Sequence, residues 1–370
     1  MKRYISILLL LALLPALRPT AITVAAAEPA SLSAECATLY DAENRRVLYG
    51  KNASKRHPMA STTKIMTALI ALEALPLDTV ITVPREATGI EGSSVYLREG
   101  EQYTLEALLY ALLLQSANDA AAVIAYAVSG GIEPFAEQMN ARAGALGLTD
   151  THFENPHGLD SDEHYTTAAE LAVIASEALA RPDFYRIVST RRYIFTSLNG
   201  ENPRTLINHN KMLMLYDGAV GVKTGYTKRC GRCLVTAAER DGLLLVSVTL
   251  DAPDDWSDHQ ALLDYGFEQY ESRLLAEEGT LTLEIPIFNA GITATVKNRD
   301  AMRLVIKKDA PTPAPTFDLR PSPVAPIRAG EIAGIVSFTD GDGITVSSPL
   351  VFSEDLPLPN QRKGWFGFGR

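Results

Sequence analysis

The chain has 370 residues, of which 46% are hydrophobic and 21% are charged, and its formal net charge is −10. This composition excludes a disordered chain and leaves room for one large domain or two ordinary ones. The acidic balance excludes the basic surface that nucleic-acid binding requires, and three cysteines are too few for a disulfide scaffold.

The first 27 residues have the pattern of a secretory signal peptide. Lys2 and Arg3 precede an apolar run over residues 5–17, which is too short to span a bilayer as a stable helix. Three alanines at 25–27 follow, so we place the mature start at Glu28; an uncleaved N-terminal anchor is the alternative. We therefore expect a secreted protein that works outside the cytoplasmic membrane, at the cell wall or at a membrane surface.

The predicted elements of residues 28–270 place strands at both ends and helices between them. We expect a β-hairpin over Cys36–Tyr49, then helices from Ser61 and over Thr104–Leu114, Asp119–Val128, Ile132–Ala145 and Thr167–Ala180, then strands over Val220–Thr224, Leu234–Glu239 and Leu243–Leu250. Asp241-Gly242, between the last two strands, is a strong hairpin signal. This order predicts an α+β domain in which helices flank an antiparallel sheet.

Residues 271–349 are expected to form a small all-β C-terminal domain. Apolar residues alternate over 281–306, and further strand patterns cover Ile332–Phe338 and Ile344–Ser347. The Pro-rich stretch 311–326 is expected to be an extended surface loop. Residues 350–370 form a tail whose last nine residues are basic, aromatic and glycine-rich, which suits peripheral contact with a membrane interface.

Three short patterns that can carry chemistry occur in order: Ser61-Thr62-Thr63-Lys64, Ser116-Ala117-Asn118 and Lys223-Thr224-Gly225. By chance, a chain of this composition would contain the first two about 0.6 and 0.7 times and the third about 0.06 times. Taken singly, they can equally be a helix cap, a turn between helices and an exposed strand lysine. The ordered set is therefore much more specific than any of its members.

The first pattern suits a serine nucleophile with a lysine base. Ser61 and Lys64 lie three residues apart at a predicted helix start, so both project from one face. A neutral amine can take the hydroxyl proton while the serine attacks a carbonyl, and N–H groups at the helix start can hold the oxyanion. A lysine is neutral only if burial or a second cation lowers its pKa, and Lys223 can be that cation.

The other two patterns supply complementary groups. Ser116 falls in a short break between two apolar helices, where its hydroxyl can relay a proton. Asn118 can orient the motif lysine or hold a substrate amide. Gly225 lets the backbone of an edge strand approach a substrate closely, while Lys223 and Thr224 can bind a carboxylate.

These residues make the chain resemble the serine penicillin-binding proteins and β-lactamases, which carry the same set of three motifs. The low-molecular-weight D-alanyl-D-alanine carboxypeptidases are the most similar group. Segments 58–68, 155–159 and 221–227 resemble that family's nucleophile segment, its loop bordering the active site and its third-motif strand. The resemblance covers about residues 34–270, and residues 281–308 resemble the family's β-rich second domain more faintly.

The resemblance implies a serine-type D-Ala-D-Ala carboxypeptidase that acts on pentapeptide stems of peptidoglycan. Ser61 would be the acylated nucleophile, Lys64 its general base, and the terminal D-Ala would leave before water releases the shortened peptide. The oxyanion hole would consist of the backbone N–H groups of Ser61 and Tyr226, and β-lactams would acylate the same serine. Some members have an arginine just ahead of the third motif; here His209 stands there and is expected to line the cleft. The resemblance implies no cofactor and no metal.

Two alternatives use the same residues. A β-lactamase or a DD-endopeptidase would have the same fold, although Glu154 lacks the spacing of a deacylating glutamate and is expected to be an exposed loop residue. A penicillin-binding sensor or wall-binding protein would be acylated without turnover, but the intact motif lysines argue against an inactive site. The rate of deacylation and the length of the substrate distinguish these alternatives.

Four other features are expected to be structural. Cys230 and Cys233 form a C-x-x-C pattern, for which redox or zinc chemistry is the alternative, and we expect a turn with Cys233 in the core. Asp340–Gly343 lacks the later ligands of a calcium loop and is expected to be a hairpin turn. The histidines at 152, 157 and 164 match the spacing of no standard metal site and are expected to pack in polar loops, with metal binding as the alternative. The acidic segment 254–259 is expected to be a solvated helix start.

Overall fold

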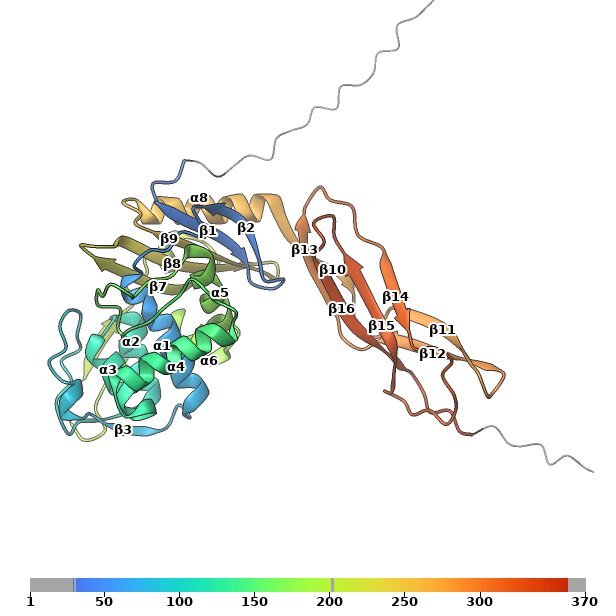
Figure 1. The fold of residues 1–370 in the computed structure, drawn as a ribbon, viewed down its shortest axis with the longest axis horizontal. Coiled ribbons are helices and arrows are strands. Elements are labelled where there is room, and N and C mark those ends of the chain that lie inside the picture. Colours follow the sequence, from blue (N-terminus) through green and yellow to red (C-terminus); the bar gives the residue numbers. More distant parts are fainter. Residues whose placement is uncertain (1–28, 30, 201–202, 359–370) are drawn as a thin grey trace, which may run out of the picture.

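The computed structural model describes residues 29, 31–200 and 203–358, and Figure 1 shows them as a helix-rich domain followed by a slender β domain. The predicted signal peptide and the basic, aromatic end of the tail lie outside the described residues. Within the described part of the chain, no helix is long and apolar enough to cross a membrane. The expected α+β fold with a C-terminal all-β domain is confirmed.

A five-stranded antiparallel sheet forms the centre of the first domain, in the order β2-β1-β9-β8-β7. Its strands are β1 (Cys36–Asp41), β2 (Arg46–Lys51), β7 (Ala219–Thr227), β8 (Gly231–Arg240) and β9 (Leu243–Leu250). Strand β1 pairs with β9 from Cys36↔Leu250 to Asp41↔Leu245, so the two ends of the domain meet in the middle of the sheet. This arrangement leaves the motif strand β7 at an edge.

Helices cover both faces of this sheet (Figure 1). They are α1 (Lys64–Ala74), α2 (Leu105–Leu114), α3 (Asn118–Ser129), α4 (Ile132–Ala145), α5 (Ala168–Leu179), α6 (Pro182–Val188), α7 (Met212–Leu215) and α8 (Asp255–Gln269), with 3-10 turns η1 (Ala60–Thr63) and η2 (Arg85–Ala87). Helix α8 covers one face, and the block around α1 covers the other. Residues 64–71 of α1 are all buried, because this helix is surrounded by other elements. The lysine at its start therefore lies inside the protein.

Two small two-stranded sheets beside the helices were not expected from the sequence. Strand β3 (Val80–Thr82) pairs with β4 (Gln102–Thr104), and β5 (Arg192–Phe195) pairs with β6 (Arg204–Ile207). Strands this short show too little alternation to be recognised. They are joined by the rings of Tyr103 and Phe195, which stack with their centroids 4.5 Å apart.

The second domain has its own apolar core. A five-stranded sheet has the order β11-β12-β16-β15-β14, and β10 pairs separately with β13. The strands are β10 (Tyr270–Ala276), β11 (Thr282–Ile287), β12 (Ile292–Asn298), β13 (Met302–Lys307), β14 (Pro315–Leu319), β15 (Ile332–Thr339) and β16 (Thr345–Phe352). The segment 340–343 is the predicted turn, between β15 and β16.

Prolines caused two errors in this domain. The stretch 311–326 is not all loop, because β14 lies within it and pairs with β15. Its first residue, Pro315, starts an exposed edge strand, where a missing N–H is tolerated. The predicted boundary at residue 349 also cuts through β16, since Pro349 sits inside that strand opposite Ile335. The chain stays paired as far as the bridge between Ile327 and Leu356.

The segment 254–259 is the expected helix start, at the beginning of α8, but the expectation that it is solvated is wrong for Asp255, Asp258 and His259, which are buried. The Asp258 carboxylate accepts hydrogen bonds from the Ser33 hydroxyl and the Ala34 N–H, each at 2.8 Å. His259 is fully buried between the hydroxyls of Ser247 (2.7 Å) and Thr249 (3.0 Å), and burial lowers its pKa to about 3. These partners come from distant segments, so the local sequence gave no sign of them.

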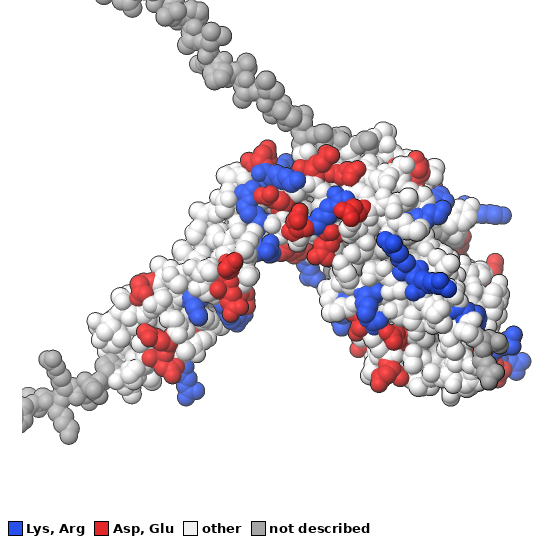
Figure 2. All heavy atoms as spheres, turned by 180° about the vertical axis from the view of Figure 1, so that it is seen from behind, with Lys and Arg blue, Asp and Glu red and all other residues white. Residues whose placement is uncertain are grey.

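The turn between β1 and β2 connects the two domains. The Arg46 guanidinium pairs with Asp340 at 3.0 Å and donates to the Val305 carbonyl at 2.5 Å. The Asn44 side chain accepts from the Val305 N–H at 2.6 Å. Acidic and basic side chains lie next to one another on the protein surface (Figure 2). Helix α8 also runs directly into β10 at Tyr270, so the two domains are joined without a linker.

Asp41 lies beneath this turn and is completely buried. One carboxylate oxygen accepts from the N–H groups of Glu43 (3.0 Å) and Asn44 (3.1 Å), and the other lies 3.5 Å from Arg46 Nε. Burial raises the pKa of Asp41 from 3.8 to about 6. The folded protein therefore holds a proton here at pH values where the unfolded chain has lost it.

This pKa predicts that Asp41 reduces stability as the pH rises from about 4 to about 6. The loss is at most about 3 kcal/mol, because a tenfold change in proton affinity corresponds to about 1.4 kcal/mol. Asp41→Asn keeps the acceptor oxygen and should remove this loss. Urea unfolding of both proteins at pH 4 and pH 7 measures the effect, with the exposed Asp78→Asn as control. Equal pH dependence in wild type and Asp41→Asn would contradict the prediction.

Candidate active site

Ser61 sits on the short 3-10 turn η1, which continues directly into α1 at Lys64. The sequence predicted a helix start here, and the structure resolves it into these two parts. The turn begins at Ala60, whose φ of +47° lies in the left-handed region that costs an alanine on the order of 1 kcal/mol. Ser61 remains partly exposed while the three residues after it are buried. The candidate nucleophile is thus accessible from the pocket, while residues 62–64, which hold it in place, are buried.

Lys64 is fully buried beneath Ser61. Its Nζ donates to Ser61 Oγ at 2.9 Å, to Asn118 Oδ1 at 2.7 Å and to the His157 carbonyl at 2.5 Å. Burial lowers the pKa of Lys64 well below its usual range, and the charge of Lys223 lowers it further. A lysine with this pKa can be neutral while in hydrogen-bond contact with the serine hydroxyl, which is the geometry of a general base.

The second buried lysine, Lys223, is 1% exposed in the edge strand β7. Its Nζ donates to the Thr224 carbonyl at 2.8 Å, and burial lowers its pKa to about 7. At neutral pH this side chain is therefore divided between charged and neutral forms. Its charge opposes protonation of Lys64, as the sequence argument required.

The start of α3 joins the second motif to the base. The Asn118 amide accepts from Lys64 and donates to the Glu91 carbonyl at 2.6 Å. The next residue, Asp119, is buried and accepts from the Ser94 hydroxyl at 2.6 Å and the Leu97 N–H at 2.9 Å. Sequence reasoning missed Asp119, which fixes the loop over residues 91–97 and partly opposes the fall in the pKa of Lys64.

The loop 155–159 supplies a further contact that the sequence did not reveal. The Asn155 carboxamide accepts from the Gly158 N–H at 2.7 Å and donates to the Leu159 carbonyl at 3.0 Å, which fixes the loop. The loop then presents the His157 carbonyl, rather than its imidazole, to the base. Gly158 has a φ of +85°, and a Cβ there would lie 1.9 Å from the Ala60 carbonyl oxygen. Only glycine fits against the nucleophile turn.

A pocket of about 380 Å³ opens at Ser61. Six of its lining residues were predicted: Ser61, Ser116, His209, Thr224, Gly225 and Tyr226. The predicted Lys64, Asn118 and Lys223 do not line the pocket but lie behind its lining residues. Lys64 donates a hydrogen bond to Ser61, Asn118 accepts one from Lys64, and the charge of Lys223 acts on Lys64. The remaining lining residues are Ser93, Lys211, Arg232, Asp255 and Trp256. Sequence reasoning missed them because β8, α8, the segment before β7 and the loop over residues 91–97 bring them together only in the fold.

The backbone of β7 passes very close to the nucleophile. A Cβ on Gly225 would lie 3.2 Å from Ser61 N and from the Met59 carbonyl oxygen, which is tight for a side chain. Tyr226, the next residue, is 67% exposed beside the pocket. Ser116 lines the pocket from the break between α2 and α3, with a left-handed φ of +60°. The three motifs therefore meet around one opening.

The cysteine pair, His164 and Glu154 lie outside the pocket lining. Cys230 and Cys233 are both free and buried, at the β7–β8 turn and in β8 respectively. The neighbouring Cys233 thiol lowers the pKa of Cys230. The buried His164 ring lies 2.7 Å from the Thr63 hydroxyl in η1. Glu154 is exposed and accepts from the Ser161 hydroxyl.

The sequence profile of the family described as D-alanyl-D-alanine carboxypeptidase matches residues 23–254. The chain belongs to this carboxypeptidase family. The D-alanyl-D-alanine carboxypeptidase DacF of Bacillus subtilis is 29% identical over 371 residues, which cover 96% of this chain and 95% of the relative. The D-alanyl-D-alanine carboxypeptidase DacB2 of Mycobacterium tuberculosis is 37% identical over 235 residues, covering 61% of this chain and 80% of the relative.

Solved structures of carboxypeptidase relatives share the architecture. Penicillin-binding protein 5 of Haemophilus influenzae aligns with a TM-score of 0.73 and 25% identity, over 90% of this chain and 99% of that structure. The carboxypeptidase DacD of Francisella tularensis aligns with a TM-score of 0.67 and 27% identity, over 90% and 96%. The predicted family and enzyme class, a serine-type D-Ala-D-Ala carboxypeptidase, are confirmed by these matches.

The contact of Gly158 with the nucleophile turn gives a test of the carboxypeptidase site. Gly158→Ala should force η1 away from the loop and reduce the release of D-Ala at least 100-fold, because an error of about 1 Å in positioning costs that much. Gly147→Ala is the matched control, since Gly147 has a similar φ of +76° but open space around it. Steady-state release of D-Ala and thermal unfolding measure both variants. Equal activity of the two would show that the contact is not needed.

Proposed function

We propose that this enzyme removes the terminal D-alanine from peptidoglycan stem peptides through an acyl-enzyme formed on Ser61. The supporting observation is the 2.9 Å hydrogen bond between a serine that opens to a pocket and a fully buried lysine of lowered pKa. A serine hydroxyl becomes a useful nucleophile only beside such a base. The membership of the family supports the substrate class.

Acylation would begin with proton transfer from Ser61 Oγ to neutral Lys64. The oxygen would attack the carbonyl carbon of the penultimate D-Ala, and the N–H groups of Ser61 and Tyr226 would hold the resulting oxyanion. The close approach of Gly225 to Ser61 N supports this placement of the two N–H groups. The proton would then pass to the leaving amine, with the Ser116 hydroxyl as the relay. The C–N bond breaks and free D-Ala leaves.

Deacylation would repeat these steps with water as the nucleophile. Lys64 would take a proton from the water, which attacks the ester carbonyl and releases the shortened peptide from Ser61 Oγ. Asn118 would keep the lysine amine aimed at the serine throughout, because its Oδ1 accepts from Nζ at 2.7 Å. The β-lactam ring would be opened by the same attack, leaving a penicilloyl group on the serine.

The terminal carboxylate of the substrate would be received beside β7. Thr224 lines the pocket and Lys223 stands behind it with a pKa of about 7, so the charge supports binding when the lysine is protonated. His209 also lines the pocket, but burial lowers its pKa and makes it a poor cation. Lys211 and Arg232 are the other basic lining residues. We propose that the positive charges of these two side chains attract the carboxylate into the pocket.

No observation favours the alternatives over the carboxypeptidase. The exposed Glu154 is engaged with Ser161 and supports no role as a deacylating base of a β-lactamase. Lys64, which is hydrogen-bonded to Ser61, and Lys223, whose charge lowers the pKa of Lys64, support turnover rather than a sensor that stops after acylation. We further propose that the protein is exported and acts at the cell wall, with its C-terminal tail in peripheral contact with a membrane.

The first test compares wild type with Ser61→Ala by intact-protein mass spectrometry. Wild type should gain one long-lived penicilloyl group with excess penicillin, and it should release D-Ala from diacetyl-Lys-D-Ala-D-Ala. Ser61→Ala should do neither, because it lacks the attacking oxygen. Rapid hydrolysis of penicillin without accumulation would instead indicate a β-lactamase. A stable adduct with no release of D-Ala would indicate a sensor, and absence of any adduct would exclude Ser61 as the nucleophile.

The pKa of Lys223 predicts a pH-dependent affinity for the substrate carboxylate. The lysine is mainly charged below pH 7 and loses its charge as the pH rises, so KM for the peptide should increase about tenfold between pH 6 and pH 9. A peptide ending in D-Ala amide should not show this increase. Measuring both substrates separates the effect from titration of Lys64, which acts on both. Parallel pH profiles for the two peptides would contradict the assignment.

A further inference from the structure

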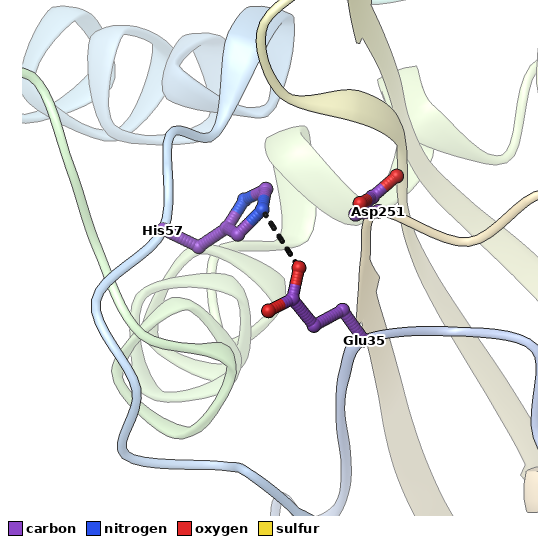
Figure 3. Close-up of side chains that lie close together, drawn as sticks. All are labelled: Glu35, His57 and Asp251. Atoms are coloured by element: carbon purple, nitrogen blue, oxygen red, sulfur yellow. Dashed lines mark ion pairs between the residues drawn. The ribbon is translucent and has the colours of Figure 1, made fainter.

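Three side chains from distant segments meet on the first domain, away from the pocket. Glu35 directly precedes β1, His57 lies shortly before the nucleophile turn, and Asp251 directly follows β9. One nitrogen or oxygen atom of each residue lies within 4.8 Å of those of the other two. In Figure 3 the imidazole faces the Glu35 carboxylate, with the Asp251 carboxylate beside them. None of the three lines the pocket at Ser61.

The histidine of this cluster has an unused ring nitrogen. His57 is only 8% exposed, and its Nδ1 lies 2.8 Å from the Pro58 carbonyl oxygen. A carbonyl can only accept, so Nδ1 carries the hydrogen and Nε2 carries the lone pair. Among the residues that the structure describes, Nε2 has no hydrogen-bond partner; Glu35 Oε2 is 3.8 Å away. More than nine-tenths of His57 is buried, and the lone pair on Nε2 is available to a ligand that reaches this cluster.

The carboxylates of Glu35 and Asp251 each have an oxygen atom near a ring nitrogen of His57. The Lys55 ammonium binds Glu35 Oε1 and lowers the pKa of that carboxyl, while Oε2 faces the histidine. The Asp251 carboxylate accepts no hydrogen bond from a side chain in the described ranges. It lies over Gly231, where a Cβ would be 2.0 Å from Asp251 Oδ1, so only a glycine leaves room for it.

We propose that Glu35, His57 and Asp251 bind one divalent transition-metal cation, with Zn²⁺ as the ion that fits best. One imidazole nitrogen and two carboxylate oxygens are three of the four ligands of a tetrahedral zinc site, and water completes it. Calcium and magnesium prefer oxygen ligands alone, whereas imidazole favours zinc and its neighbours. The two carboxylates also carry charge opposite to that of the ion.

The spacing suits this ion. Two ligand atoms of a tetrahedral zinc lie about 3.4 Å apart, because each bond is about 2.0–2.2 Å long. The 3.8 Å separation of His57 Nε2 and Glu35 Oε2 is close to that spacing. Asp251 needs to approach by about 1.4 Å at most, given the 4.8 Å bound for the group. The Pro58 carbonyl and Lys55 hold the outer sides of two ligands, as is usual at metal sites.

The ion would act as a structural clamp. It would tie the start of β1 and the end of β9 to the segment that leads into η1. His57 also pairs through its backbone with Thr166, with N···O distances of 2.8 and 3.0 Å, so the clamp would extend to the loop before α5. This role is independent of the proposed reaction on Ser61, since no step of that reaction uses the three ligands.

Titration of the EDTA-treated full chain with Zn²⁺ tests the site, with calorimetry for binding and thermal unfolding for its effect. Wild type should bind one zinc per chain with micromolar or tighter affinity, and its Tm should rise by about 5 °C at a zinc concentration of 100 Kd. His57→Gln and Asp251→Asn should each weaken binding at least tenfold and lose most of the rise. His152→Gln is the matched control: its Nδ1 also meets a carbonyl, Glu163 O at 2.6 Å, and zinc binding should not change.

Two results would overturn the proposal. If wild type binds no zinc, the cluster is a set of ordinary polar contacts. If the variants bind zinc as wild type does, the ion binds elsewhere. The free cysteines Cys230 and Cys233 are then the other candidate ligands, and replacing zinc with cobalt would show their thiolate charge-transfer band. Unfolding in EDTA shows whether each variant is folded, and Glu35→Gln replaces any variant without a cooperative transition. Loss of D-Ala release with zinc binding intact would affect the proposed reaction only.

Discussion

The withdrawal of two lysine ammonium groups from water is the condition on which the rest of this site depends. A buried ammonium is unfavourable, and two that oppose each other's charge are more so. Lys64 is retained in the interior because three oxygens, from Ser61, Asn118 and His157, surround its Nζ. Each oxygen belongs to a different segment, so the base is positioned only when η1, α3 and the loop 155–159 are all in place. Folding and activation of the serine are therefore one event.

The backbone around this arrangement is held in unfavourable conformations. Ala60 and Ser116, which border the nucleophile and the pocket, both have positive φ without being glycine, and Tyr96 in the loop fixed by Asp119 does too. Such residues persist only where their surroundings over-determine them. Here the surroundings are the fully buried α1 and the close packing of Gly158 on Ala60. The packing of the apolar core thus offsets the unfavourable backbone conformations at the site.

Much of this molecule follows from local sequence. The bounds of α4 and β9 agree with the expected ranges, because an amphipathic repeat and a run between turn residues are local signals. The three motifs also come together as expected. What could not be predicted is of two kinds. A backbone atom such as the His157 carbonyl has no residue-type signature, and pocket residues such as Arg232 and Trp256 become neighbours only through the packing of α8 on the sheet.

The direct passage of α8 into β10 has a mechanical consequence. No residues intervene between the two elements, and Arg46 of β2 pairs with Asp340 at the same junction. The catalytic sheet reaches this junction through the β1–β2 turn and through α8, which follows its central strand β9. The direction of the β domain relative to the pocket is therefore set by these few contacts and by the passage of α8 into β10.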